Sequence, residues 1–458
     1  MPTAPQPLSP AAIALNRFGL GARPDDAPPA EPRRWLLDQF AAFEVRPAAF
    51  ASLADAGALV RRYRDERRAA PGSEKTERKA SRQDFREDAQ ALYRAAVQAR
   101  ADSALTTPAP FVERMTHFWA NHFCVSADNP RVAAYAGAFE RDAIRPHVLG
   151  RFADMALAAE RHPAMLVYLN QANSIGPDSP AAARAAQRKR GLNENLAREI
   201  MELHTLGVRS GYTQADVTEF ARALTGWTVD ELGGAEGDPD LFAFRLAQHE
   251  PGARTILGRR YDQPGEEQAR AALIDFAHAP ATATHVATKL ARHFAGDAPP
   301  PALVARLAAS FTATGGDLPS LYRVLIASPE PWTPAPVKFK SPWEWTVSAL
   351  RGLGKRDAAP LQIAALQNEL GQPVWKPGSP AGWDDLASAW AAPDALLRRV
   401  ELAARLTAPV GERLDARALA PRLIPASLGS ATASQIARSE SPAAALALLL
   451  VSPDFLRR

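Results

Sequence analysis

Residues 193–208 read NENLAREIMELHTLGV, and this stretch shows the pattern that decides the fold. Projected at about 100° per residue, as in an α-helix, its apolar side chains share one face. They are Leu196, Ala197, Ile200, Met201, Leu203 and His204. Asn193 stands where an N-cap belongs, and Glu194 in the first turn complements the helix dipole. The stretch therefore predicts an amphipathic helix whose buried face has His204 at its centre.

Helical patterns of the same kind extend to both sides of this stretch. Several begin with recognisable caps, at Ser9–Pro10, Thr213–Asp216 and Ser341–Glu344. The polar residues 70–86 predict an exposed loop or a frayed helix start, followed by a long helix from about residue 84 to 102. The predicted fold class is all-α, mainly α-helical, with residues 1–458 forming one large multi-helix unit.

Strand patterning interrupts the helices in one region. Residues 241–248 alternate apolar and other side chains, residues 249–252 resemble a turn, and residues 254–261 read as a return strand. We therefore expect a small inserted β-hairpin near 241–261, within an insertion at 230–263. A Pro-, Ser- and Ala-rich stretch at 171–192 predicts an exposed loop.

The composition excludes several classes of protein. The chain has 458 residues, and its 54 basic and 50 acidic residues give a formal charge of +4. Cys124 is the single cysteine, so an intrachain disulfide, a CxxC redox pair and an all-thiolate metal site are excluded. No apolar stretch has the length of a membrane-spanning helix. The N-terminal text shows no export signal, which makes a cytoplasmic location the default expectation.

The basic residues are mostly arginine, with 46 Arg and 8 Lys. Clusters such as residues 61–68 (RRYRDERR) mix acids with bases, as a solvated helix face does. A contiguous basic track of the kind that binds phosphates is not evident. We therefore expect no nucleic-acid partner.

Several strings along the chain are similar to those of a known family. Besides residues 193–208, they are AIALNRFGLGARP (12–24), FWANHF (118–123), HPAMLVYL (162–169), GYTQADVTEFARALTGW (211–227), KLARHF (289–294) and KFKSPWEW (338–345). Together they resemble the bacterial family called domain of unknown function 1800 (DUF1800), in the family's order and over nearly the whole chain. The string at 193–208 is the most specific of them.

The resemblance implies a largely helical protein without a settled activity. Genes of this family often neighbour those of a second, sulfatase-like family, so a protein encoded there is the partner that the resemblance implies. Many relatives are exported. This sequence departs from the family by lacking an obvious signal and by carrying Ala120 where many relatives have a further histidine.

Three histidines are the candidate metal ligands. His122 lies at the centre of the apolar arc of residues 113–125, as His204 does on its own helix, and His293 lies at the edge of an apolar face one turn after Lys289. A buried imidazole without a partner costs about 1–3 kcal/mol, so each ring needs a hydrogen bond or a metal. One interpretation is a transition-metal centre between helices, completed by a carboxylate. The other is that His122 and His204 bond to backbone carbonyls, and no HExxH or comparable motif decides between them.

Three further residues are candidate catalytic groups. Glu199 and Glu202 are one helical turn apart on the opposite face from His204, where paired carboxylates can serve as an acid and a base. The alternative for them is a salt-bridged network with Arg198. His249, at the predicted hairpin turn, either overhangs a cleft or is an exposed turn residue.

Two lesser features complete the set. Lys189 and Arg190, just before the helix capped by Asn193, form a weak anion-binding signal. Cys124 is expected to be a small buried side chain.

The leading hypothesis is an enzyme with a buried His/Glu site, working by a metal or by acid–base chemistry. The competing hypothesis is a non-catalytic partner or scaffold of the sulfatase-like protein. Convergence of His122, Glu199, His204 and His293 on one pocket would favour the enzyme. If His122 and His204 each bonded to a separate backbone carbonyl, a structural role would be favoured.

Overall fold

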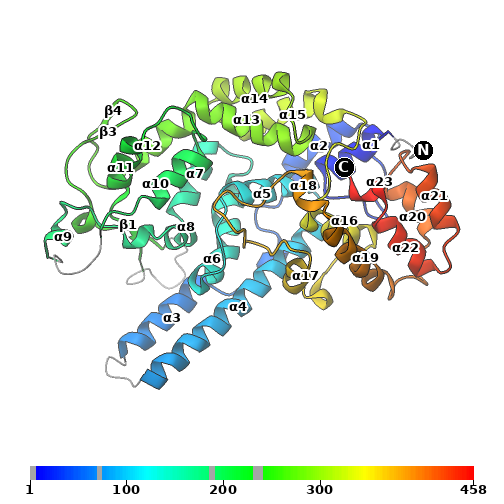
Figure 1. Cartoon of the computed structure of the whole chain (residues 1–458), viewed down its shortest axis with the longest axis horizontal. Helices are drawn as coiled ribbons and strands as arrows, with labels where there is room; N and C mark the ends of the chain where they lie inside the picture. The colour runs from blue at the N-terminus through cyan, green and yellow to red at the C-terminus, as the bar shows by residue number, and fades with distance from the viewer. Residues whose placement is uncertain (1–6, 70–74, 185–190, 231–240) are drawn as a thin grey trace.

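The computed structural model describes residues 7–69, 75–184, 191–230 and 241–458. Over these residues the chain is mainly helical with two small antiparallel sheets, which confirms the predicted fold class (Figure 1). Buried apolar side chains from Leu8 to Leu456 form one continuous cluster. No helix in the described ranges is long and apolar enough to cross a membrane.

In the described part of the N-terminal third, the named elements are all helices, joined by loops. Its α-helices are α1 (Pro10–Ile13), α2 (Pro32–Ala42), α3 (Ala56–Ala69), α4 (Lys75–Thr106), α5 (Pro110–His122), α6 (Pro130–Phe139), α7 (Phe152–Arg161) and α8 (Pro163–Tyr168). Helices α3 and α4 project from the body as a long hairpin (Figure 1). Of the two alternatives predicted for residues 70–86, the loop is wrong from Lys75 onward and a helix start is found there, because the Lys, Glu, Arg and Ala residues of this stretch are good helix formers.

The middle of the chain contains the strands. It comprises α9 (Pro180–Arg184), α10 (Asn195–Glu199), a π-helical turn (Ile200–His204), α11 (Gln214–Leu224), β1 (Trp227–Val229), β2 (Phe242–Phe244), β3 (Arg254–Ile256) and β4 (Arg259–Tyr261). Strand β1 pairs with β2, with Thr228 opposite Ala243, and β3 pairs with β4, with Thr255 opposite Arg260. Parts of the predicted loop at 171–192 and of the insertion at 230–263, with Lys189 and Arg190, lie outside the described residues.

A hairpin does lie within residues 241–261, but its strands differ from the expected ones. The expected partners, 241–248 and 254–261, do not pair with each other; the second segment folds back on itself. Leu257 and Gly258, between β3 and β4, have φ values of 50° and 75°. Two consecutive positive φ values are what a tight two-residue hairpin turn requires, so this turn closes inside the segment that the sequence predicts as a single strand.

The C-terminal part is again helical. It contains α12 (Glu266–His278), α13 (Pro280–Ala295), α14 (Pro301–Thr314), α15 (Leu318–Ala327), α16 (Pro342–Gly352), α17 (Ile363–Glu369), α18 (Ala387–Trp390), α19 (Pro393–Thr407), α20 (Ala416–Leu423), α21 (Ser430–Ala437), α22 (Pro442–Leu450) and α23 (Pro453–Leu456). The first and the last helix, α1 and α23, lie on the same side of the molecule (Figure 1). Ser9 N donates to Ser427 Oγ at 2.7 Å, which ties the first helix to this C-terminal part.

Three of the predicted helix caps are confirmed. Ser9 caps α1, and the reciprocal capping boxes at Thr213–Asp216 and Ser341–Glu344 are both formed. Asn193 Oδ1 accepts a hydrogen bond from Asn195 N at 2.9 Å, at the start of α10. These side chains satisfy backbone N–H groups that have no partner inside the helix, and so they fix where the helices begin.

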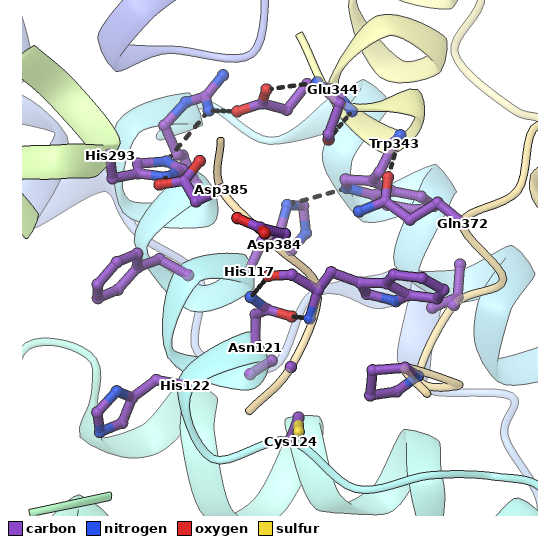
Figure 2. A pocket seen from close by; sticks show the side chains of 18 of the residues that line it. His117, Asn121, His122, Cys124, His293, Trp343, Glu344, Gln372, Asp384 and Asp385 are labelled. Atoms are coloured by element: carbon purple, nitrogen blue, oxygen red, sulfur yellow. Dashed lines mark hydrogen bonds and ion pairs between the residues drawn. The ribbon is translucent and has the colours of Figure 1, made fainter. Parts of the chain in front are cut away.

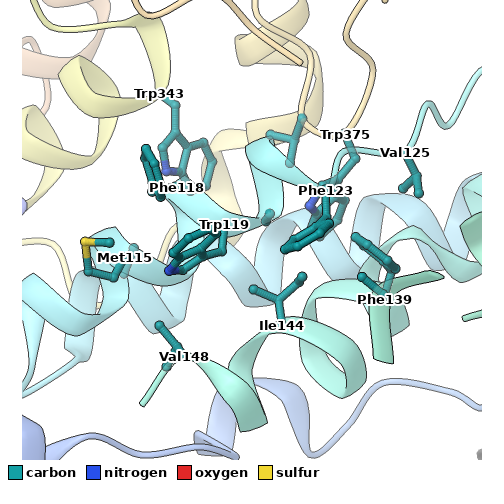
Figure 3. Packing of buried hydrophobic residues seen from close by; sticks show 14 of the residues in the cluster. Met115, Phe118, Trp119, Phe123, Val125, Phe139, Ile144, Val148, Trp343 and Trp375 are labelled. Carbon is teal, nitrogen blue, oxygen red and sulfur yellow. The ribbon is translucent and has the colours of Figure 1, made fainter. Parts of the chain in front are cut away.

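Helix α5 lies at the centre of the core. Trp119 on this helix is fully buried and donates from Nε1 to Tyr322 Oη at 2.6 Å. Around it pack the aromatic and aliphatic side chains of the neighbouring elements, among them Phe123, Phe139 and Ile144 (Figure 3). Burying each such side chain stabilises the fold by about 1.5–3 kcal/mol. The position of α5 is therefore firmly set, and its polar side chains have defined surroundings.

Candidate functional site

A pocket of about 380 Å³ lies beside the central helix, between α5, α13, the start of α16 and the segment 371–390 (Figure 2). Four tryptophans line it: Trp343, Trp375, Trp383 and Trp390. Four cationic side chains also line it: Arg100, Arg114, Lys289 and Arg292. Aromatic walls combined with a few charged groups are typical of small-molecule sites.

The segment 371–390 forms one wall and is held in place by α5 and the residues after it. Asn121 Nδ2 donates to Trp383 O at 2.9 Å, and Trp383 N donates to Asn121 Oδ1 at 2.8 Å. Between these bonds Gly382 has a φ of 83°. A Cβ at Gly382 would collide with the backbone oxygen of Asn121, so the close approach needs glycine.

Cys124 also contacts this wall. Its Sγ lies 3.0 Å from Pro380 O and the side chain is buried. Burial raises the pKa of the thiol to about 12. Cys124 is therefore a protonated packing residue, in keeping with the interpretation of its sequence context.

His293 and Asp385 form a hydrogen-bonded pair at the edge of the pocket. The two atoms, His293 Nδ1 and Asp385 Oδ2, are 3.0 Å apart, and His293 Nε2 lies 3.4 Å from Arg114 Nη1. Because a guanidinium can only donate, this contact places the proton on Nδ1 and a lone pair on Nε2. Burial lowers the pKa of His293, so the ring is neutral near pH 7.

Asp385 is kept ionised by its surroundings. Burial opposes its ionisation, but the interactions with His293 and Lys338 outweigh burial and lower the pKa of Asp385 to about 2. Lys338 Nζ lies 3.4 Å from Asp385 Oδ1 and 2.9 Å from Asp297 Oδ1. The aspartate is thus a fixed acceptor for the Nδ1 proton of His293.

Glu344 links this pair to a wider ionic network. It forms an ion pair with Arg114, and its Oε1 lies 2.8 Å from Arg458 Nη2. These two arginines overcome the effect of burial and hold the pKa of Glu344 well below its usual range. We call His293, Asp385, Arg114 and Glu344 the pocket network.

His117 is a further neutral histidine beside the pocket. Trp343 Nε1 donates to His117 Nδ1 at 3.2 Å. Burial and the charges of Arg100 and Arg145 hold the pKa of His117 well below its usual range. It therefore serves as a hydrogen-bond acceptor for the wall residue Trp343.

Two of the predicted histidines, His122 and His204, lie next to each other on the core side of this pocket. The rings of His122 and His204 have centroids 6.2 Å apart, and His122 Nε2 donates to His204 O at 3.0 Å. His204 Nδ1 lies 2.8 Å from Glu160 Oε1, a carboxylate that is completely buried. We call His122, His204 and Glu160 the buried histidine cluster.

The other predicted residues lie apart from both groups. Glu199 and Glu202 are partly exposed on α10 and the π-helical turn, and neither lines the pocket. Burial raises the pKa of Glu199. His249 is buried, with its Nδ1 2.8 Å from Thr225 O.

Of the four residues whose convergence on one pocket would favour an enzyme, only two line the same pocket. His122 and His293 line the same pocket, whereas His204 contacts His122 from the side of the core and Glu199 stays outside. His122 bonds to a backbone carbonyl, as the structural interpretation expects, but His204 is paired with a carboxylate. Within the described ranges no three His, Cys, Asp or Glu side chains are placed so that they could share one metal ion.

Several site residues were not found from the sequence. On α5 the polar residues Arg114, His117 and Asn121 follow a spacing of three and four, which places them on one face of the helix, and all three line the pocket. That spacing could have revealed them. Asp385 and Glu160 had no such signal, because their contacts join segments 92 and 44 residues apart in the chain.

Fold and pocket together define a class: a mainly helical protein with an aromatic pocket enclosed by an ionic network. The chain belongs to the DUF1800 family, described as proteins of unknown function, whose sequence profile matches residues 13–457. The resemblance found in the sequence is thereby confirmed. Comparison with curated proteins and with solved structures gave no match.

Proposed function

We propose that this chain is an enzyme that transfers protons in the pocket, with His293 as its general base. The observation that carries this proposal is the placement of His293 between Asp385 and Arg114 at the pocket. A histidine whose Nδ1 proton is held by a carboxylate presents its Nε2 lone pair in a fixed direction. Asp385 is then the positioning residue.

The geometry leaves this lone pair accessible to a substrate. The 3.4 Å separation from Arg114 Nη1 is long for a hydrogen bond between nitrogens. Arg114 is also held by other acceptors, since it pairs with Glu344 and its Nε donates to Gly19 O at 2.8 Å. A substrate proton can therefore replace the weak contact with Arg114 while the arginine keeps its position.

The remaining walls suit acid–base chemistry on a small organic molecule. Trp383 and Trp390 have ring centroids 5.8 Å apart and cover one side of the pocket. Aromatic walls bind apolar ring surfaces and lower the local dielectric, which strengthens charge interactions with the reacting groups. In this proposal the buried histidine cluster supports α5 from the core side.

A general-base probe tests the proposal without knowledge of the natural substrate. 5-Nitrobenzisoxazole is flat and aromatic; a base removes its C–H proton, the N–O bond breaks, and a coloured phenolate forms. We expect His293→Gln to lower the rate by about a hundredfold or more, as loss of a general base does. His278→Gln is the matched control, because His278 is exposed on α12 and does not line the pocket.

Equal rates for the wild type and His293→Gln would overturn the proposal. Binding of the probe without any turnover that depends on His293 would favour the non-catalytic alternative, a protein that binds a ligand or a partner at this pocket.

A further inference from the structure

Two cations on α13 line the pocket without a counter-ion. Lys289 and Arg292 are one helical turn apart, and both face the pocket. Over the residues that the structure describes, neither side chain makes an ion pair or a hydrogen bond, and Arg292 Nε is a buried atom without a partner. Burial lowers the pKa of Lys289 to about 8. The charge of Asp385 acts in the opposite direction, and repulsion by Arg292 adds a smaller lowering.

Most other charged side chains of the pocket have a partner of opposite charge, whereas Asp384 has no ion pair among the described residues. Arg100 Nε lies 2.8 Å from Glu140 Oε2, and Arg114 pairs with Glu344. Asp385 is matched by His293 and Lys338, as described above. Asp384 is exposed, and its Oδ1 accepts from the backbone N–H of Leu386 at 2.9 Å. Lys289 and Arg292 are thus the cations of this pocket that have no ion-pair partner over the described residues, although the charge of Asp385 favours the protonated form of Lys289.

Unpartnered hydrogen-bond donors also indicate a ligand with acceptor oxygens in this pocket. Over the described residues, Arg292 Nε and Trp383 Nε1 are buried atoms of the lining without an acceptor. His122 also lines the pocket. Because its Nε2 donates to His204 O, its Nδ1 is an acceptor, and this atom has no donor among the described residues. Leaving buried donors unpaired is costly, so a ligand that supplies acceptor oxygens would satisfy them.

We propose that the ligand of this pocket is an aromatic or similarly flat molecule that carries a carboxylate or a phosphate group. The anionic group pairs with Lys289 and Arg292, and the flat part packs against Trp383 and Trp390. Both anions offer the same chemistry to the two cations, namely charged acceptor oxygens. This inference names the substrate class of the proposed function and rests on it.

The position of the cations relative to the base supports this arrangement. Lys289 and His293 are four residues apart on α13 and therefore share a face of the helix. An anionic group held by Lys289 would place the adjoining part of the ligand near His293 Nε2. The same site would also stabilise negative charge that develops when His293 removes a proton.

Binding measurements with simple anions test the inference. Phenyl phosphate and benzoate are titrated into the full chain by calorimetry, with benzyl alcohol as the neutral ligand of similar ring size. We expect both variants, Lys289→Met and Arg292→Met, to weaken the binding of the better anion at least about tenfold, as loss of a charge-assisted hydrogen bond does. Benzyl alcohol is expected to bind weakly and equally to all proteins. The relative affinities of phenyl phosphate and benzoate show which anionic group the site prefers.

Two further proteins complete the design. Lys289→Arg keeps the charge and should retain most of the affinity, which separates charge from side-chain packing. Arg270→Met is the matched control, because Arg270 lies on α12, outside the pocket, and pairs with Glu267 at 3.0 Å. Thermal unfolding of each variant establishes that it is folded.

Several outcomes would overturn the inference: failure of both anions to bind, equal binding by the wild type and Lys289→Met, or binding of benzyl alcohol as tight as that of the anions. The test is independent of turnover. Anion binding that needs Lys289 without any reaction that needs His293 would overturn the proposed function alone. Turnover that needs His293 without anion binding would overturn the inference alone.

Discussion

Histidines of the pocket network and of the buried histidine cluster face different surroundings. His293 bonds to a carboxylate and lines the pocket, with Arg114 Nη1 3.4 Å from its other nitrogen. His204 is also paired with a carboxylate, Glu160, but it is 1% exposed and does not line the pocket. The residue types of the two pairs are thus nearly the same. The difference shows that an acid–histidine pair becomes a candidate for chemistry only where a ligand can reach the ring.

The largest effect should come from breaking the buried pair. His204→Ala leaves Glu160 without its one close partner in the described part of the chain. Replacing a large buried side chain by alanine costs about 2–5 kcal/mol, because it leaves a cavity, and here it also leaves a buried carboxyl group without a neighbour among the described residues that could pair with it. Urea unfolding followed by circular dichroism measures this loss, and the folded variant should still bind phenyl phosphate as the wild type does.

His278→Ala, at an exposed position on α12, should change the stability little and serves as the control. The opposite result would be a His204→Ala variant with unchanged stability and lost turnover. It would make the buried histidine cluster, and not the pocket network, the active centre.

A substitution in the wall of the pocket should have the next largest effect. Gly382→Ala forces an alanine into a backbone with a φ of 83° and against the backbone oxygen of Asn121. Strain of this kind costs about 1–3 kcal/mol, and the wall must move to relieve it. We expect weaker binding of phenyl phosphate, measured by calorimetry, and a lower unfolding midpoint.

Gly378→Ala is the matched control within the same segment. Gly378 is exposed, and a Cβ there meets no atom within 4 Å. If both alanine variants bound phenyl phosphate as the wild type does, the segment 371–390 would not form the functional wall.

The sequence predicted the helical fold and the burial of His122 and His204 because both follow from local periodicity. It also predicted the helix caps, whose partners lie three residues apart. It did not reveal Asp385, since nothing in the surrounding loop indicates that this carboxylate meets α13. The interaction of His204 with Glu160 was missed for the same reason, because helical periodicity predicts the face of a side chain but not its partner.

The bounds of strands β3 and β4 also could not be predicted from the sequence. Residues 254–261 have the composition of one strand, yet the positive φ values at Leu257 and Gly258 make them two. Leucine rarely adopts a positive φ. Gly258 was therefore the one residue of this turn that could have indicated it from the sequence. Likewise, the π-helical turn at 200–204 departs from the regular projection used for residues 193–208, although His204 still faces the core.

A smaller effect is expected where the wall is joined to α5 by side-chain hydrogen bonds. Asn121→Ala removes both bonds to the backbone of Trp383. Each such bond contributes about 0.5–1.5 kcal/mol, so the unfolding free energy should fall by about 1–3 kcal/mol, with the lower half expected because water can reach the partly exposed site. Asn121→Asp keeps an acceptor for Trp383 N and should lose less; equal losses would show that the bond from Trp383 N has no net effect.

The smallest effect, and the one that tests the pocket network most directly, is a shift in pH dependence. Burial lowers the pKa of His293 below its ordinary value of 6.5, so the base is active at neutral pH and turnover of 5-nitrobenzisoxazole should fall only in acid, through a pKa below 6.5. The carboxylate of Asp385 acts in the opposite direction, since it stabilises the protonated ring. Asp385→Asn removes this stabilisation, and we therefore expect the acid limb of the rate profile to move to lower pH. Glu199→Gln is the control, because Glu199 does not line the pocket and should leave the limb in place. A limb that moved in Glu199→Gln, or that stayed fixed in Asp385→Asn, would assign the titrating base to a residue other than His293 and would remove the contrast between the two histidine pairs.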